Sequence, residues 1–280
     1  AQIARHYIQA QTQTIPEPLL NRVEAGIRAY DPCLSCSTHA AGQMTLHVAL
    51  VAADGTVLDE VARGYNEEVT VVSGRLADAI NPVLIKYVER ILIIDFDVHH
   101  GNGTQEIFYD RPEVMYISTH EYPFYPGTGS VEEAGSGEAK GTKVNIPLPA
   151  GCGDSEYLKV FEQVIAPSAR RFKPQLILVS AGYDPHWADS LALMQVTTTG
   201  FARMVGIINE LAGELCSGRM AVCLEGGYHL EALAHSVKAT FDVLLGSDSI
   251  EDPLGESQRR FEAPSIDALI GKIKRIHSLF

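Results

Sequence analysis

The sequence predicts an α/β protein whose parallel sheet is covered by helices on both faces. From Tyr87 onward, short apolar runs rich in Ile, Leu and Val recur along the chain. Such continuous apolar runs are typical of parallel strands that are buried on both faces. Helix-length segments separate several of these runs, as in repeated strand–helix units. Strands are expected at 91–97, 114–118, 143–147, 176–180 and 220–224, and helices at 154–172, 197–216 and 229–245.

The residues before this region follow a different pattern. Residues 16–30 carry apolar positions at helical spacing and end at an Asp-Pro pair, where proline disfavours continuation of a helix. Residues 45–62 alternate like two strands joined by an Asp-Gly hairpin turn. Residues 65–82 show no clear period, so we place a junction there. The sequence therefore predicts a segment of residues 1–75 followed by an α/β domain of residues 76–280.

Composition limits the classes of function. The chain of 280 residues has a net charge of −13, which argues against binding nucleic acid through a basic face and mildly favours cationic substrates. Its five cysteines are scattered through apolar segments, a usage typical of a reducing compartment. No apolar run reaches the length of a membrane span, and the first residues lack a signal-peptide core. We expect a cytoplasmic protein that binds neither membranes nor nucleic acid.

Polar side chains that could form a functional site follow three of the expected strands. Asp97 and His99 follow ILIID, Asp184 follows LILVSAG, and Tyr228 follows VCLEGG. Ligands of open α/β sheets bind beyond the carboxyl ends of the strands. Asp97 and His99 are two residues apart, so an extended backbone points both side chains the same way. One imidazole and two carboxylates suit zinc or ferrous iron with an open position for substrate.

Turn chemistry is the alternative explanation of these residues. A single Asp after a strand often caps a helix or forms a turn, and a Gly-Gly pair is common in turns. The occurrence of such residues at the ends of several separate strands favours the metal site.

At these residues the chain resembles the histone deacetylase superfamily, which includes bacterial acetylpolyamine and acetoin-utilisation relatives. The resemblance implies an α/β sheet of the arginase/deacetylase type and the hydrolysis of an acetamide. The implied substrate is an acetylated lysine peptide, an acetylated polyamine or another small acetylated amine. The matching motifs are DFDVHHGNGTQEIFYD (95–110), MYISTHEYPFYPGTG (115–129), NIPLPAGCGD (145–154), VSAGYDPHWADSL (179–191) and LEGGYHLEALA (224–234).

The resemblance also implies roles for individual residues. Asp97, His99 and Asp184 match the ligands of a catalytic Zn²⁺ ion, a position that Fe²⁺ also suits. Tyr228 matches the hydroxyl that donates a hydrogen bond to the oxyanion of the tetrahedral intermediate.

Further positions match the substrate channel and a second ion. Gly226 and Gly227 match residues that let the backbone approach the acyl-lysine chain, and Tyr125 matches an aromatic wall of the channel. Asp95 and Ser118 match a structural potassium site that also uses backbone oxygens. K⁺ is therefore the second cofactor that the resemblance implies.

One part of the family's pattern is missing from this sequence. The family's catalytic tandem histidine lies in an Arg-Pro-Pro-Gly-His-His stretch, whereas the only adjacent histidines here are His99 and His100. A positioned base adds about 10²–10⁴-fold to the rate, so we expect weak or absent activity even where metal binds. The family's N-terminal strands are missing too. We therefore expect a sheet that is incomplete at its N-terminal side, with an open edge that favours aggregation or a homo-oligomer.

The front of the chain resembles a different family. YDPCLSCSTHAAGQM (30–44) resembles the C-terminal end of a nickel–iron hydrogenase large subunit. The resemblance implies that Cys33 and Cys36 are metal ligands, that cleavage follows His39, and that residues 40–64 are a removable tail. The chain has no second Cys-x-x-Cys, so we expect an inert remnant.

These observations together predict a chimera whose function follows its longer part. That function is zinc-dependent deacetylation of an acetylated amine. Two alternatives stay open at this point: a nickel–iron hydrogenase fragment, and a remnant that binds metal without catalysis.

Overall fold

The computed structural model describes residues 44–51, 57–65, 88–247, 249–259 and 261–279. The chain divides into two units, residues 1–87 and residues 88–280. Several predictions lie outside the described residues: the helix at 16–30, the junction at 65–82, and the hydrogenase-like Cys33, Cys36 and His39.

The first unit contains an antiparallel pair of strands. Strand β1 (Met44–Val51) pairs with β2 (Val57–Tyr65), starting with Met44 opposite Tyr65. The register shifts between Leu50 and Val51, next to the connection of the two strands. The pair confirms the two strands expected at 45–62, while the predicted Asp-Gly turn lies among residues that are not described.

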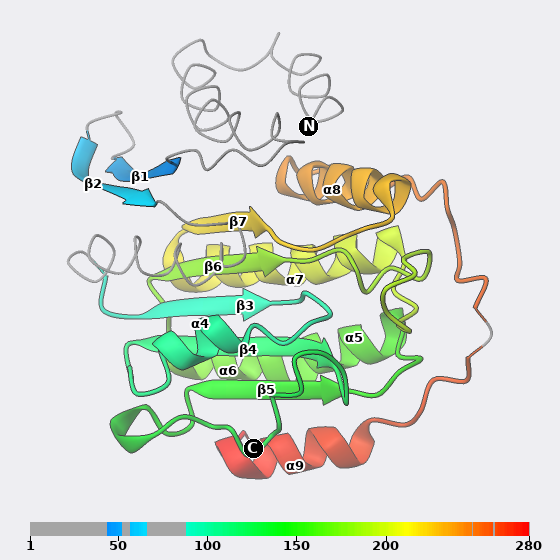
Figure 1. Ribbon diagram of the computed structural model, residues 1–280, viewed down its shortest axis with the longest axis horizontal. Coiled ribbons are helices and arrows are strands. Elements are labelled where there is room, and N and C mark those ends of the chain that lie inside the picture. The colour runs from blue at the N-terminus through cyan, green and yellow to red at the C-terminus, as the bar shows by residue number, and fades with distance from the viewer. Residues whose placement is uncertain (1–43, 52–56, 66–87, 248, 260, 280) are drawn as a thin grey trace, which may run out of the picture. The chain divides into compact units, whose positions relative to one another are not determined.

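The second unit is built on a five-stranded sheet with every neighbouring pair parallel, in the order β5-β4-β3-β6-β7 (Figure 1). Each expected strand is present, but β3 ends at Asp95 rather than at the expected Asp97, so Asp97 lies in the turn after the strand, and β4 runs on past the expected end at Ser118. Strands β3 and β6 are neighbours near the middle, so the turns that follow them meet at the same edge. The strands are β3 (Ile91–Asp95), β4 (Val114–Glu121), β5 (Lys143–Leu148), β6 (Leu176–Ala181) and β7 (Met220–Leu224).

The helices confirm the predicted alternation. The segment expected at 154–172 consists of α5 (Asp154–Val160), a π-helical turn and α6 (Ala166–Phe172). The helices expected after it are α7 (Thr198–Cys216) and α8 (Leu230–Leu244). Figure 1 shows α5, α6 and α7 behind the sheet and the short α4 (Asn102–Ile107) in front of it. Helices therefore lie on both faces, as the sequence predicts.

The sequence analysis missed two helices, α4 and α9 (Asp267–His277). The six residues of α4 are too few for a helical period to be visible. Helix α9 does carry a signal, because Ile266, Ile270 and Ile273 recur at helical spacing and are all buried. It lies beside β5, at the opposite side of the sheet from β7 (Figure 1).

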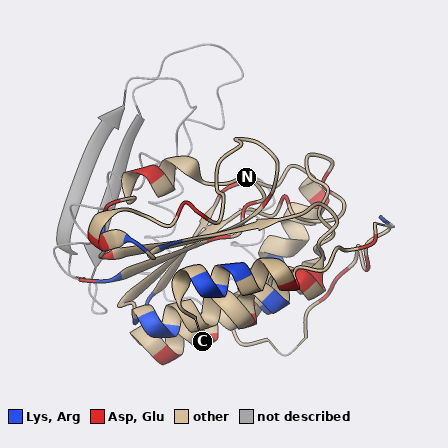
Figure 2. Cartoon of the chain, turned by 90° about the horizontal axis from the view of Figure 1, so that it is seen from below, with Lys and Arg blue, Asp and Glu red and all other residues tan. Residues whose placement is uncertain are grey.

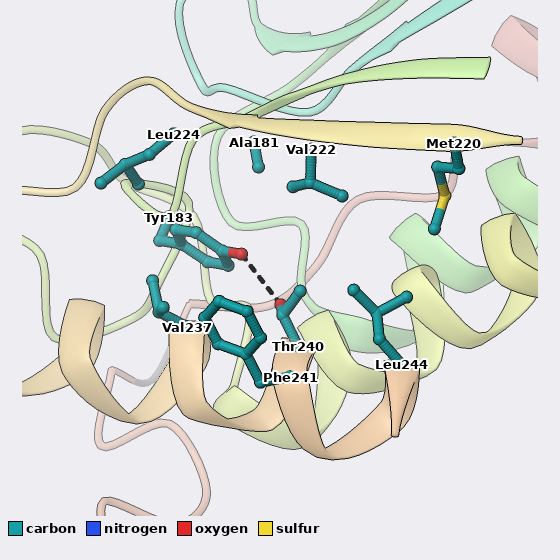
Figure 3. Close-up of a pocket in the computed structure, with 9 residues that line it drawn as sticks. All are labelled: Ala181, Tyr183, Met220, Val222, Leu224, Val237, Thr240, Phe241 and Leu244. Atoms are coloured by element: carbon teal, nitrogen blue, oxygen red, sulfur yellow. Dashed lines mark hydrogen bonds between the residues drawn. The ribbon is translucent and has the colours of Figure 1, made fainter. Parts of the chain in front are cut away.

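The outer edge of β7 is the most exposed part of the sheet. Among the described residues no strand pairs with this edge, and Leu224 is 58% exposed. A groove of about 300 Å³ lies between α8 and strands β6 and β7 (Figure 3). Its walls are apolar except for a hydrogen bond of 2.8 Å between the hydroxyls of Tyr183 and Thr240. The lining residues are Ala181, Tyr183, Met220, Val222, Leu224, Val237, Thr240, Phe241 and Leu244.

Residues of both charge signs are distributed along the helices and loops of the chain (Figure 2). On α9, Lys272 pairs with Glu132, and Asp267 of the same helix pairs with Lys159. In the part of the chain that the structure describes, no helix has both the length and the apolar character needed to cross a bilayer.

Candidate metal centre

The fold brings together the three predicted metal ligands. Asp97 and His99 follow β3, and Asp184 follows β6. Because β3 and β6 are paired in parallel, with Asp95 opposite Ser180, their turns lie side by side. One donor atom from each of the three side chains lies within 4.8 Å of the others.

The contacts of His99 leave one carboxylate oxygen without a hydrogen bond. Its Nδ1 atom is 3.0 Å from Asp97 Oδ1 and 3.1 Å from Asp184 Oδ2. One N–H group makes only one well-directed hydrogen bond, and here Asp97 accepts it. Asp184 is wholly buried, and its Oδ1 accepts the Val98 N–H at 2.9 Å, whereas Oδ2 makes the ion-pair contact with His99 but no directed hydrogen bond. A cation is the kind of partner that such a buried carboxylate oxygen requires.

The charges of the cluster lead to the same inference. The carboxylates of Asp184 and Asp97 raise the pKa of His99 to about 10. Burial raises the pKa of Asp184 to about 6, although the His99 ring opposes this rise. In the metal-free protein a proton on His99 therefore balances the carboxylates. A divalent cation would supply this balance more fully, and the donor set of one nitrogen and two carboxylates fits Zn²⁺ or Fe²⁺.

Glycines bring the backbone close to these ligands. A Cβ at Gly182 would lie 2.2 Å from Asp97 Oδ2, and a Cβ at Gly226 would lie 2.3 Å from Asp184 Oδ2. The Gly226 N–H donates to Asp97 Oδ2 at 2.9 Å. Gly227 has a φ of 132°, which L side chains rarely adopt. Gly226 and Gly227 were expected near the site; Gly182 was missed, because nothing in its local sequence shows what it contacts.

Two aromatic rings flank the imidazole of His99. Phe124 stacks on it with ring centroids 5.5 Å apart, and Tyr125 meets it edge-on at 6.2 Å. Tyr125 is 76% exposed, so its ring extends from the cluster toward solvent. The structure thus brings the predicted channel residue Tyr125 to the cluster and adds Phe124. The aromatic-rich run YPFY was the signal that could have identified Phe124.

Tyr228 lies between β7 and α8 and is 57% exposed. Its backbone N–H donates to Asp189 Oδ2 at 2.6 Å. Partial burial and the charges of Asp184 and Asp97 raise the pKa of its hydroxyl, which therefore stays protonated at neutral pH and can donate a hydrogen bond.

The residues expected to hold potassium are neighbours in the sheet. Asp95 is opposite Ser118 in the β3–β4 register. Asp95 is buried, which raises its pKa, and its carboxylate accepts hydrogen bonds from the Asp97 N–H and the Tyr116 hydroxyl. The Ser118 hydroxyl is 2.9 Å from His120 Nδ1. The potassium ion itself stays a prediction.

Two buried histidines near the cluster are already hydrogen bonded at both ring nitrogens. His100 contacts Thr128 and Gln105, and His120 contacts Ser118 and the Gly129 carbonyl. Burial lowers the pKa of both, that of His120 to about 3. Neither ring has a free nitrogen with which to take a proton from water.

The fold and this cluster define an α/β protein with a candidate catalytic metal centre at the carboxyl edge of its sheet. The family model of the histone deacetylase domain matches residues 77–244, and the chain belongs to that family. Histone deacetylase 10, chloroplastic, from Oryza sativa subsp. japonica is 48% identical over 69% of this chain and 44% of its own length. Histone deacetylase HDA1 from Saccharomyces cerevisiae is 33% identical over 98% of this chain and 40% of its own length. The crystal structure of the HDA15 HD domain has a TM-score of 0.61 at 38% identity, over 72% of this chain and 55% of that one.

These likenesses confirm the predicted arginase/deacetylase type of fold. The chain spans about half the length of the curated relatives it matches. The alignment with yeast HDA1 includes 98% of the chain, and the comparisons provide no support for a hydrogenase-like segment or a chimera.

Proposed function

We propose that this chain is a metal-dependent deacetylase that hydrolyses the acetamide of an acetylated lysine or small amine. The observation that carries the proposal is the cluster of Asp97, His99 and Asp184, in which the buried Asp184 Oδ2 contacts the His99 ring and accepts no directed hydrogen bond, in a chain of the histone deacetylase family. The relatives named above are histone deacetylases, and acetyl-lysine is the corresponding substrate.

The three clustered side chains would hold Zn²⁺ or Fe²⁺. A metal held there would supply Lewis-acid chemistry toward the substrate carbonyl and water. Gly226 donates its N–H to Asp97 and so holds that carboxylate in place. The hydroxyl of Tyr228 would donate a hydrogen bond to the carbonyl oxygen as it gains charge, an interaction worth about 3 kcal/mol in typical oxyanion sites.

The aromatic pair beside His99 would bind the substrate's alkyl chain. Phe124 and the exposed Tyr125 both contact the His99 ring, so a chain lying on them would lead to the ligands. The absence of side chains at Gly226 and Gly227 would let this chain approach the backbone. The net charge of −13 favours substrates with free amines, such as acetylated polyamines.

Proton transfer limits the expected rate. Among the described residues, His100 and His120 are committed to other hydrogen bonds and are not free to act as the base. A positioned base typically adds about 10²–10⁴-fold to the rate, so we expect slow turnover. The proposed potassium ion, held by Asp95 and Ser118, would stabilise the turn that carries Asp97 and His99.

The test is deacetylation by the full chain loaded with Zn²⁺ or Fe²⁺, on an acetyl-lysine peptide and on N-acetylputrescine. We expect slow, metal-dependent release of acetate, accelerated about tenfold by added 2-methylimidazole, which supplies a base. Asp184→Asn should abolish this activity, and Asp110→Asn, at an exposed position, should retain it. A chain that binds metal but hydrolyses neither substrate, even with the added base, would be a remnant without catalysis and would contradict the proposal.

A further inference from the structure

Asp189, in the turn after β6, holds three backbone N–H groups with one buried carboxylate. Its Oδ2 accepts from Tyr228 at 2.6 Å and from His229 at 3.0 Å, and its Oδ1 accepts from Leu191 at 3.0 Å. The residue is only 1% exposed. We infer that Asp189 is a positioning residue: it holds the backbone of Tyr228, and with it the position of the Tyr228 side chain, two residues after Gly226, whose N–H contacts the ligand Asp97. This inference rests on the proposed function.

Tyr228 needs such an anchor because packing does not hold it. Its side chain is 57% exposed, and the two residues before it are glycines, which have the largest conformational freedom. Three hydrogen bonds to carboxylates restrain residues 226–229: the Gly226 N–H donates to Asp97, and the N–H groups of Tyr228 and His229 donate to Asp189. Hydrogen bonds to a charged acceptor are about twice as strong as neutral ones, so they can replace packing here.

Asp189 is itself firmly placed. Its N–H donates to the His186 carbonyl at 2.9 Å. Its own carbonyl accepts from the guanidinium of Arg259, which also donates to the carbonyls of Ala192 and Met194. Arg259, from the C-terminal part of the chain, thus secures the turn that carries the carboxylate. The connection runs from Arg259 through Asp189 to Tyr228.

Asp189→Asn tests the inference with little change in size. The amide nitrogen cannot accept an N–H, so at least one of the three hydrogen bonds is lost. Asp154→Asn is the matched control. Asp154 also accepts a backbone N–H, from Thr197 at 2.8 Å, but it is not one of the carboxylates that hold residues 226–229. Both variants are made in the full chain, alone and combined with Tyr228→Phe, and zinc affinity is measured first. It should be unchanged in Asp189→Asn, because Asp189 is not a ligand.

The expected result is a double-mutant cycle in which the effects of Asp189→Asn and Tyr228→Phe on kcat are not additive. Asp189→Asn should lower kcat about 10–100-fold with KM within about threefold, and Asp154→Asn should change kcat less than about threefold. Tyr228→Phe should lower kcat about 100-fold in the parent but less than about threefold in Asp189→Asn, because the hydroxyl is already misplaced there. The inference would be overturned if Tyr228→Phe lowered kcat by the same factor in the parent and in Asp189→Asn. It would also be overturned if Asp154→Asn lowered kcat as much as Asp189→Asn does.

A binding cycle separates this inference from the proposed function. Acetohydroxamate presents a carbonyl oxygen to a zinc-loaded site without needing turnover. Tyr228→Phe should weaken its binding about tenfold in the parent and about twofold in Asp189→Asn; equal weakening would count against positioning. If the parent shows no turnover, the proposed function fails, and the binding cycle still decides the role of Asp189.

A second variant covers the case in which Asp189→Asn does not fold. Arg259→Lys keeps the positive charge but loses the planar fork that reaches three carbonyls. We expect a several-fold loss of kcat that is again non-additive with Tyr228→Phe. An additive combination would contradict the connection from Arg259 to Tyr228.

Discussion

Strands β3 and β7 both contribute turns to the metal centre, but they are held in different ways. All five residues of β3 are buried, whereas β7 has no fully buried residue and an outer edge that no described strand pairs with. Asp97 and His99 therefore follow a strand that is fixed by packing. Tyr228 follows a strand that packing holds weakly, and hydrogen bonds to Asp97 and Asp189 fix its segment instead. The comparison indicates that packing of a buried strand supports Asp97 and His99, whereas hydrogen bonds to carboxylates support the expected oxyanion donor.

The largest effect should come from the ligands supported by the central strands. Asp184→Asn removes a charged ligand from a wholly buried position. Changes to residues that only support a ligand cost about 10–100-fold in metal affinity, so loss of the ligand itself should cost more than about 100-fold. Zinc titration against a competing chelator measures this effect. Tyr228→Phe, in the turn after the edge strand β7, should leave zinc affinity within about twofold of the parent. If it weakened zinc binding as much as Asp184→Asn, Tyr228 would be acting as a ligand rather than as a hydroxyl donor.

Substitutions on the two strands should differ in their effect on folding. Ile94→Ala, at a wholly buried position of β3, should lower the free energy of unfolding by about 2–5 kcal/mol. Leu224→Ala, at a position of β7 that is 58% exposed, should cost less than about 1 kcal/mol. Urea unfolding followed by the fluorescence of the single tryptophan, Trp187, reports on this unit. Similar costs at the two positions would mean that the edge of β7 is covered in solution.

The pH dependence of metal binding tests whether His99, in the turn after β3, carries a proton in the metal-free protein. The metal-free protein holds a proton on His99, whose pKa is raised to about 10 by Asp184 and Asp97. A metal must displace this proton, so apparent zinc affinity should rise about tenfold per pH unit between about pH 7 and 8.5. For the metal-free protein the sign is opposite: His99 stabilises the fold fully below its unfolded pKa of about 6.5, and this contribution declines as the pH rises toward about 10.

Isothermal titration at buffered free zinc, in buffers of different ionisation enthalpy, would count the released proton. Release of about one proton per zinc is expected. No release in this pH range would show that the imidazole is not a ligand.

The smallest effect is expected for self-association through the edge of β7. No described strand pairs with this edge; an open apolar edge favours pairing with a second copy, and a lysine on the edge opposes it. Leu224→Lys should weaken concentration-dependent association several-fold in sedimentation velocity, without a change in zinc affinity. Lys274→Leu at the distant α9 serves as the control surface change. A parent protein that stays monomeric at high concentration would contradict the predicted oligomer.

The positions of the strands and of the metal ligands could be read from the sequence. Buried parallel strands are continuous apolar runs, and a polar residue directly after such a run must lie at the ligand-binding edge, so Asp97, His99 and Asp184 were identifiable. Helix α9 was missed although Ile266, Ile270 and Ile273 show its period. These features depend on local patterns of side chains, which are present in the linear sequence.

The contacts between distant segments could not be read in this way. The pairing of Asp189 with Tyr228 joins residues 39 positions apart, and Gly182 and Gly226 approach carboxylates from other strands. The unsatisfied Oδ2 of Asp184 likewise depends on where His99 lies. Local patterns specify which residues form strands and where the strands end. The register and packing of those strands set the distances between their ends, and these distances determine which groups meet.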